Sequence, residues 1–219
     1  MDTILEFLQT IQTPMIETLI MVSVSALASV LLGLPLGIIL TVTDKGHILE
    51  NKAVNTIIGT LVNIFRSVPF IILLIALLPL SKIVLGTSLG IKAATLALSI
   101  AAAPFVARII ESSLKEVSYG LIEASLAAGA TNAQIILKVM LPEALPSLIL
   151  GVTLSIINII GYSAMAGAVG AGGIGDFAIR EGYMKYNNEA IILTIIVLII
   201  LVEIIQQSGN FLARKFDKR

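Results

Sequence analysis

The 219-residue chain contains no cysteine and only one histidine. The lack of cysteine excludes disulfide bonds, thiolate nucleophiles and cysteine-based metal sites. Charged residues make up only 13% of the chain and their net charge is zero, so no basic field suggests nucleic acid as a partner. No GxxxxGK[ST] phosphate-binding loop occurs anywhere in the sequence. The chain is therefore not expected to hydrolyse ATP by itself in the usual P-loop manner.

The sequence also lacks a convincing catalytic, cofactor or metal site. His47 lies in the polar stretch TDKGHILENK with no candidate partner nearby, so we expect a solvated loop residue. The stretch from Gly170 to Gly175, GAGGIG, matches the GxGxxG pattern by letter. The dinucleotide-binding fingerprint requires a strand before it and a helix after it in a soluble βαβ unit, whereas this stretch follows an apolar helix. We expect an external turn or gate there, no bound cofactor, and no enzyme.

Apolar residues dominate the composition of the chain. They form 57% of the chain, and the mean hydropathy is +1.03. Soluble domains usually carry about 25% charged residues, so the composition indicates an all-α, polytopic membrane protein in the lipid bilayer. A span needs about 20 apolar residues, so the length allows about five or six spans in one domain.

The apolar runs predict five transmembrane helices, at about 18–43, 54–80, 91–110, 147–169 and 189–207. Residues 1–17 carry no Lys or Arg, unlike a signal peptide, and are expected to form a short interfacial helix that ends before Pro14. Residues 111–146 form a polar loop and residues 208–219 a basic tail. Gly33 and Gly37 have the GxxxG spacing that permits close contact with another helix.

The positive-inside rule sets the orientation. An odd number of spans places the termini on opposite sides of the membrane. Putting the basic tail in the cytoplasm places the larger set of cations inside, namely Lys45, Lys52, Arg108, Lys115, Lys138, Arg214, Lys215, Lys218 and Arg219. Only Lys82, Lys92, Arg180 and Lys185 then lie outside. We therefore expect the N-terminus outside and loop 111–146 in the cytoplasm.

Arg66 interrupts the second apolar run and allows two interpretations. If the span begins near residue 54, Arg66 lies about 18 Å along it, close to the midplane, and must face protein or water. If the true span starts near Ser67, Arg66 extends to the lipid headgroups instead.

The cytoplasmic loop is predicted to contain two short helices. Gly129 suits the left-handed position that ends the first helix. Thr131 and Gln134 match the reciprocal capping box that starts the second, and Pro142 and Pro146 are expected to stop it. The loop contains more apolar residues than a solvated loop requires, namely Leu126, Ile135, Ile136, Val139 and Met140. These residues either dock on a partner protein or pack beneath the chain's own helices.

The same loop resembles the EAA loop of bacterial ABC importer permeases, whose pattern is E-A-A-x3-G-x9-I-x-L-P. The matching residues are Glu123, Ala124, Ser125, Gly129, Val139, Leu141 and Pro142. Ser125 replaces an alanine and Val139 an isoleucine, and the spacing agrees throughout. The resemblance implies that 123–142 is a coupling helix that fits a groove on an ATP-binding cassette ATPase subunit.

Three further segments narrow the resemblance. The segment NIFRSVPF at 63–70, the glycine-rich segment YSAMAGAVGAGGIG at 162–175 and the Gly182-Tyr183 pair resemble the five-span permease of methionine importers. That resemblance implies a homodimer in the bacterial cytoplasmic membrane, served by ATPase subunits and an extracytoplasmic substrate-binding protein, that imports methionine by alternating access. Another small solute is the alternative substrate.

Polar residues on an otherwise apolar helix suggest the pathway. Ser155, Asn158 and Tyr162 form one stripe, with Met165 nearby. Together with Arg66 they either line a path for a polar solute or bond across helix interfaces. An ATP-independent channel or carrier would need paired intramembrane carboxylates or a charged filter. Only Arg66 and Glu203 approach the membrane interior, so the importer is favoured.

Overall fold

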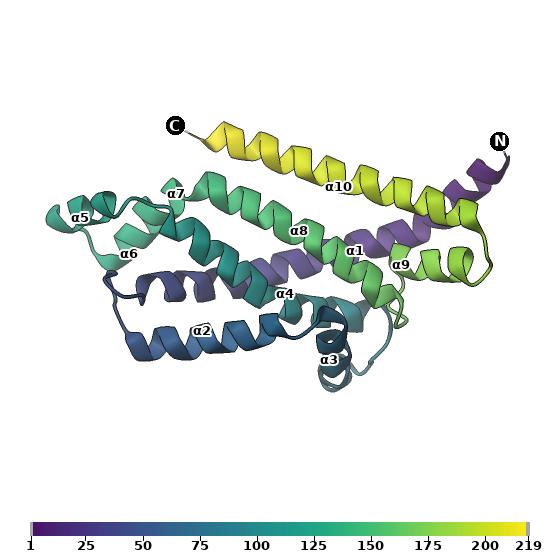
Figure 1. Ribbon diagram of the computed structural model, residues 1–219, viewed down its shortest axis with the longest axis horizontal. Helices are drawn as coiled ribbons and strands as arrows, with labels where there is room; N and C mark the ends of the chain where they lie inside the picture. The colour runs from purple at the N-terminus through teal and green to yellow at the C-terminus, as the bar shows by residue number, and fades with distance from the viewer. Residues whose placement is uncertain (1, 218–219) are drawn as a thin grey trace.

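In the computed structural model, which describes residues 2–217, all regular structure is helical (Figure 1). This confirms the predicted all-α class. The α-helices are α1 (Asp2–Val42), α2 (Lys52–Ser67), α3 (Phe70–Leu85), α4 (Gly90–Lys115), α5 (Tyr119–Ala127), α6 (Asn132–Ile135), α7 (Leu141–Glu143), α8 (Leu145–Gly167), α9 (Gly173–Phe177) and α10 (Asn188–Phe216). Two π-helical segments, η1 (Ile136–Met140) and η2 (Ala178–Tyr183), extend α6 and α9.

Four helical stretches are long and apolar enough to cross a membrane, namely Gln9–Val42 within α1, α4, α8 and α10. Helices α2 and α3 pass the same test as a pair, although they meet at an angle of 107°. Counting this pair as one broken span gives the five spans that the sequence predicts. The span expected over 54–80 is therefore two helices rather than one.

The break between α2 and α3 follows from Pro69. Proline has no N–H to donate and disfavours the helical conformation in the residue before it. Val68 accordingly adopts an extended conformation, with φ −81° and ψ 128°, and α3 starts directly after Pro69. The sequence showed this proline, but the apolar residues on both sides of it masked the change in direction.

The ends of the chain are more helical than expected. Helix α1 continues through Pro14, so the described part of the 1–17 segment belongs to the first long helix. Phe7 and Ile11 are buried against Phe177 of α9, which explains why this part of α1 stays attached to the protein. Helix α10 likewise extends through the predicted basic tail to Phe216. Met1, Lys218 and Arg219 lie outside the described residues.

Helix α4 packs against α1, α2, α3 and α8 and is the most deeply enclosed of the long helices. Alanine is the commonest residue at its buried positions, and small side chains allow neighbouring backbones to approach closely. Gly33 and Gly37 of α1 face it: a Cβ atom at Gly37 would lie 2.7 Å from the carbonyl oxygen of Ala107. The close helix contact predicted from the GxxxG spacing is therefore present within the chain.

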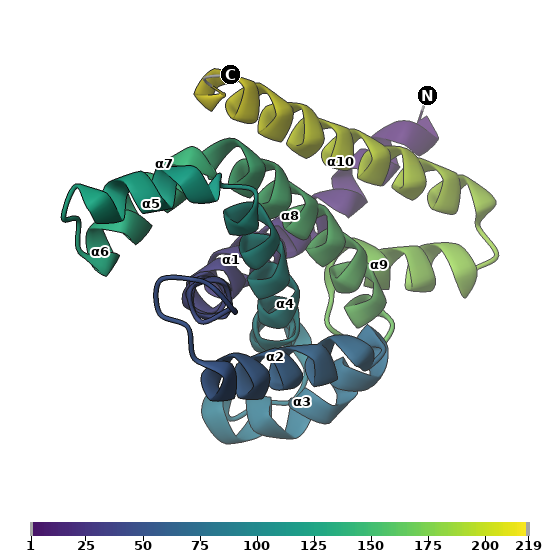
Figure 2. The ribbon, with the colours of Figure 1, turned by 60° about the vertical axis from the view of Figure 1, so that its left-hand side comes forward.

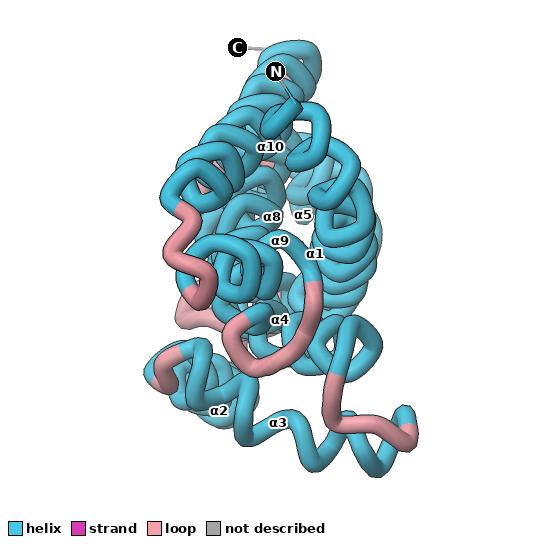
Figure 3. Tube along the Cα trace, turned by 90° about the vertical axis from the view of Figure 1, so that its right-hand side faces the viewer, coloured by secondary structure: helices cyan, strands magenta, loops and turns pink. Residues whose placement is uncertain are grey.

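The helices form a layered bundle with different structures at its two ends. Helices α4 and α8 lie between the α2–α3 pair on one side and α10 on the other (Figure 3). The α5–α7 segment projects beyond the bundle at one end (Figure 2), on the side where α10 finishes, while the start of α1 and α9 lie at the opposite end. Which end faces the cytoplasm stays the prediction made from the charges.

Replacing Gly37 with alanine should destabilise the bundle, because the added methyl group collides with the α4 backbone. Overpacking of this kind costs about 1–3 kcal/mol. The measurement is the thermal unfolding midpoint of the purified protein in detergent. Gly120→Ala is the matched control, since its Cβ would meet its nearest neighbour, Ser118 Oγ, at an ordinary 3.6 Å. Equal midpoints for the two variants would contradict the close α1–α4 contact.

Candidate functional site

Residues 111–115 of the predicted loop continue α4. Residues 119–143 fold as a helical hairpin, formed by α5, a tight turn and the continuous helical run α6–η1–α7, which we call the coupling hairpin. Gly129 occupies the turn with φ +79°, as predicted. Its N–H donates to the Leu126 carbonyl at 2.9 Å, and the Ala130 N–H donates to the Ser125 carbonyl at 3.0 Å. A Cβ at Gly129 would meet nothing within 4 Å, so the backbone angle rather than space requires glycine.

The second arm begins with the predicted capping box. Thr131 Oγ1 accepts a hydrogen bond from the Gln134 N–H at 3.3 Å, and Gln134 Oε1 accepts one from the Thr131 N–H at 2.8 Å. Two of the amide groups that a helix start leaves unpaired are thereby satisfied. The angle between the two arms is thus set by local bonds on both sides of Gly129.

Pro142 does not stop the second arm, contrary to expectation. The helix widens into η1 before the proline, and α7 follows with Pro142 in its first turn. A wider turn shifts the hydrogen-bond register, so the proline ring need not clash with a carbonyl group of the preceding turn. The chain changes direction only at Ala144, where α8 begins with Pro146 in its first turn.

The apolar residues of the coupling hairpin divide between two faces. Ile122, Ile135 and Met140 are fully buried and pack against the ends of α1 and α4. Leu126 and Leu137 remain 43% and 63% exposed. Packing beneath the chain's own helices is therefore confirmed for Ile135 and Met140, whereas docking of the exposed Leu126 on a partner stays a prediction.

The residues that match the EAA pattern lie on or beside the open face. Glu123, Ala124, Gly129 and Pro142 are exposed. The other three, Ser125, Val139 and Leu141, are half-buried, and the Ser125 hydroxyl donates to the Leu121 carbonyl at 2.7 Å. The structure thus brings the two ends of the pattern, far apart in the sequence, onto one projecting hairpin.

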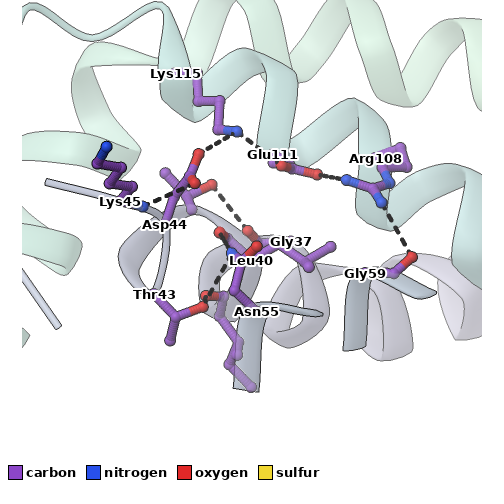
Figure 4. A network of polar contacts seen from close by, with 12 residues as sticks. Gly37, Leu40, Thr43, Asp44, Lys45, Asn55, Gly59, Arg108, Glu111 and Lys115 are labelled. Atoms are coloured by element: carbon purple, nitrogen blue, oxygen red, sulfur yellow. Dashed lines mark hydrogen bonds and ion pairs between the residues drawn. The ribbon is translucent and has the colours of Figure 1, made fainter. Parts of the chain in front are cut away.

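A chain of charged side chains ties the base of the coupling hairpin to the bundle (Figure 4). Lys115 binds Asp44 at 2.6 Å and Glu111 at 2.9 Å, and Glu111 binds Arg108 at 2.6 Å. Arg108 donates onward to α2, to the carbonyl oxygen of Gly59 at 3.1 Å and to Asn63 Oδ1 at 2.9 Å. The network joins the loop after α1, the end of α4 and the middle of α2.

Sequence reasoning missed this network, although its spacing was visible. Arg108, Glu111 and Lys115 are three and four residues apart, so they lie along one helix face. The partners on other elements required the fold. The hydrogen bond from Lys115 holds the pKa of the Asp44 carboxyl below its usual range, so the carboxylate stays charged at neutral pH.

The loop between α1 and α2 packs against the coupling hairpin. Ile48 contacts the cluster that contains Ile122 and Ile135. His47 is half-buried, with its ring edge-on to Tyr119 at 6.4 Å between centroids, so it is not the solvated residue expected from the sequence. Burial lowers the pKa of His47, and its ring is neutral at neutral pH. This loop therefore braces the hairpin.

The residues predicted to line the pathway fall into three groups. Arg66 and Tyr162 share a hollow of about 140 Å³, and Tyr162 stacks on Phe70 with ring centroids 4.1 Å apart. Met165 is 49% exposed and Asn158 half-buried on the same helix. Ser155 is buried, and its hydroxyl donates to the Gly151 carbonyl at 2.8 Å, so it faces the chain's own interior.

The glycine-rich segment has a defined conformation. Gly170, Gly172 and Gly173 adopt φ values of +82°, +84° and +78°, which end α8 and turn the chain into α9. Two residues of α1 hold the start of α9: the Glu17 carboxylate accepts the Gly173 N–H at 2.7 Å, and the Thr18 hydroxyl accepts the Ile174 N–H at 2.8 Å. The expected external turn is thus fastened to the first helix.

Comparison with known proteins yields consistent matches. Residues 33–219 match the family described as "Binding-protein-dependent transport system inner membrane component". The probable D-methionine transport system permease protein MetI of Vibrio cholerae is 49% identical over 203 residues, which cover 93% of this chain and 90% of that protein. The methionine import system permease protein MetP of Bacillus subtilis is 46% identical over 181 residues, covering 83% and 82%.

The fold agrees with a solved transporter. A chain from the structure described as "Inward facing conformations of the MetNI methionine ABC transporter" superposes with a TM-score of 0.91 at 46% sequence identity. The match covers 92% of this chain and 94% of that chain. The family match, these relatives and the shared fold agree: the chain belongs to the binding-protein-dependent transport system inner membrane components.

Proposed function

We propose that the chain is the permease subunit of an ATP-driven importer that carries methionine across the bacterial cytoplasmic membrane. The observation that carries this proposal is the coupling hairpin at one end of the helical bundle, on which four of the seven EAA-type residues are exposed. The chain itself is a transport subunit and not an enzyme. An extracytoplasmic binding protein delivers the substrate.

The ATPase belongs to a separate subunit. The sequence contains no phosphate-binding loop, while the hairpin offers exposed Leu126 beside exposed Glu123 and Gly129. A short helix with an exposed apolar residue is suited to a groove on another protein. The anchored face of the hairpin, through Ile122 and Ile135, passes any displacement to α4.

Two copies of the chain enclose the pathway. One face of α8 is left uncovered by the chain's own helices, with Leu150, Leu154 and Met165 exposed by 44%, 50% and 49%. These residues recur at helical spacing along one stripe, with Gly161 exposed and Asn158 half-buried between them. A second copy meeting this stripe gives a symmetric dimer with a path between the two α8 helices.

The transport cycle follows from these connections. ATP binding closes the ATPase subunits and draws the two coupling hairpins together. The charged network carries the movement from α4 to α2, because Arg108 bonds directly to Gly59 and Asn63. The α2–α3 break, the Tyr162 region and the exposed stripe then open outward to accept substrate, and hydrolysis restores the inward-facing state.

Methionine is the substrate that the relatives favour, since the names of the similar permeases of Vibrio cholerae and Bacillus subtilis include D-methionine and methionine, respectively.

The test of the proposed function is ATP-dependent uptake of labelled methionine by the complex reconstituted in vesicles with its ATPase and binding protein. We expect uptake that requires ATP and is blocked by unlabelled L- or D-methionine more strongly than by other amino acids. Uptake by the chain alone in ATP-free vesicles would contradict the importer, and transport of a different solute would contradict the substrate.

Gly129→Val should uncouple ATP hydrolysis from transport. A β-branched residue is strained at φ +79°, so the turn opens and the arms of the hairpin lose their relative angle. Gly129→Asn is the matched control, because asparagine tolerates the left-handed conformation. We expect the valine variant to insert normally but to lose co-purifying ATPase and at least about 90% of its uptake, an effect of about 1.4 kcal/mol or more. Equal coupled uptake by the two variants would argue against the assigned turn.

A further inference from the structure

The hollow between α2, α3, α4 and α8 lies where the backbone of the second span breaks. Irregular backbone at membrane depth is tolerated where it is enclosed by protein or lines a cavity, and discontinuous helices mark binding sites in many transporters. Here the break at Val68 forms part of the wall, and Tyr162 of α8 closes the opposite side. The unusual geometry therefore coincides with a space for a ligand.

Among the described residues that line this hollow, Arg66 is the only charged one, and its side chain is exposed. Within residues 2–217 it makes no hydrogen bond or ion pair with another side chain, whereas Arg108 and Arg180 are both paired with carboxylates. An arginine beside apolar walls is costly to place in a membrane without a partner. The guanidinium group thus has its full set of donors available for an anionic group.

The remaining walls are apolar and rich in aromatic rings. Phe65, Phe70 and Phe105 line the hollow with Tyr162, whose ring lies nearly parallel to that of Phe70 at 8°. Aromatic rings make favourable contacts with aliphatic groups and with thioether sulfur. None of the lining residues is acidic, so the site offers nothing that would specifically bind an ammonium group.

The size of the hollow limits what it holds. Its volume is about 140 Å³. That is smaller than pockets for drug-sized ligands, which begin at about 300 Å³. It suits part of a small amino acid.

We infer that this hollow is a transit subsite for an amino acid with an apolar side chain. Arg66 binds the α-carboxylate with its paired N–H groups, and the Phe70–Tyr162 stack contacts the side chain. The inference rests on the proposed function, because it supplies the step between delivery by the binding protein and release into the cell. Specificity would then reside partly in this chain and not only in the external protein.

The position of Arg66 links this subsite to the coupling hairpin. Arg66 is in the last turn of α2, the helix that Arg108 holds through Gly59 and Asn63. A shift of α4 relative to α2 moves the guanidinium relative to Tyr162 on α8. The subsite would therefore hold the carboxylate in one state of the cycle and lose one of its walls in the other.

The test measures binding of labelled methionine to the complex of permease and ATPase without the binding protein, in nanodiscs of phosphatidylcholine. Methioninamide, which lacks the carboxylate, serves as the second ligand. We expect the wild-type complex to prefer methionine, and Arg66→Gln to weaken methionine binding about tenfold or more while changing methioninamide binding little. Arg66→Lys should retain part of the preference, since lysine keeps the charge but not the paired donors.

Lys82→Gln is the matched control, because it removes an exposed cation from α3 outside the hollow and should alter neither ligand. No measurable methionine binding by the wild-type complex, or equal weakening of the binding of both ligands by Arg66→Gln, would overturn the subsite.

A lipid phosphate is the other anion that Arg66 could bind. If adding phosphatidylglycerol abolishes methionine binding by the wild type, Arg66 is a lipid site and the inference fails.

Failure of the proposed function is distinguishable from failure of the subsite. If the complex imports another amino acid in place of methionine, the same comparison of its acid and amide forms still tests Arg66. If it imports methionine and Arg66→Gln leaves the preference for the acid form intact, the proposed function stands and the subsite is wrong.

Discussion

Close packing of α4 against its four neighbours is the constraint on which the rest of the structure depends. Its buried alanines and the facing Gly33 and Gly37 of α1 bring the backbones together, with no room for one added methyl group at Gly37. In a bilayer such contacts replace the hydrophobic effect as the force that holds helices together. The arrangement makes α4 a shared neighbour of α1, α2, α3 and α8.

Two functional regions are attached to this one helix. Its C-terminal turns hold the coupling hairpin through buried Ile110 and Leu114, and its charged face binds α2. Its middle supplies Ala101 and Phe105 to the hollow beside Arg66 and Tyr162. One continuous helix therefore contacts both the coupling hairpin and the hollow. The charges of the network lie between the loop after α1, the last turns of α4 and the middle of α2.

The sequence predicts the local features of this fold better than its tertiary ones. The apolar runs locate the long helices, and Gly129 with the Thr131 capping box defines the hairpin turn, because each signal lies within a few residues. The bend at Pro69 was hidden since apolar residues continue on both sides, and the π-helical turn before Pro142 has no simple sequence signal. Arg66 and Tyr162 were both candidates, but their shared hollow also depends on two further helices, α3 with its Phe70 ring and α4.

The central claim is that nucleotide binding on a partner moves the paired coupling hairpins and the α4 helices behind them. The lack of cysteine allows a single spin label per copy at Lys45→Cys, an exposed position in the loop that braces the hairpin. The measurement is the distance between the two labels in the complex, formed with a cysteine-free ATPase, by pulsed electron resonance. The account predicts a shorter distance with ATP trapped than without nucleotide. An unchanged distance in a complex that hydrolyses ATP and transports substrate would contradict it.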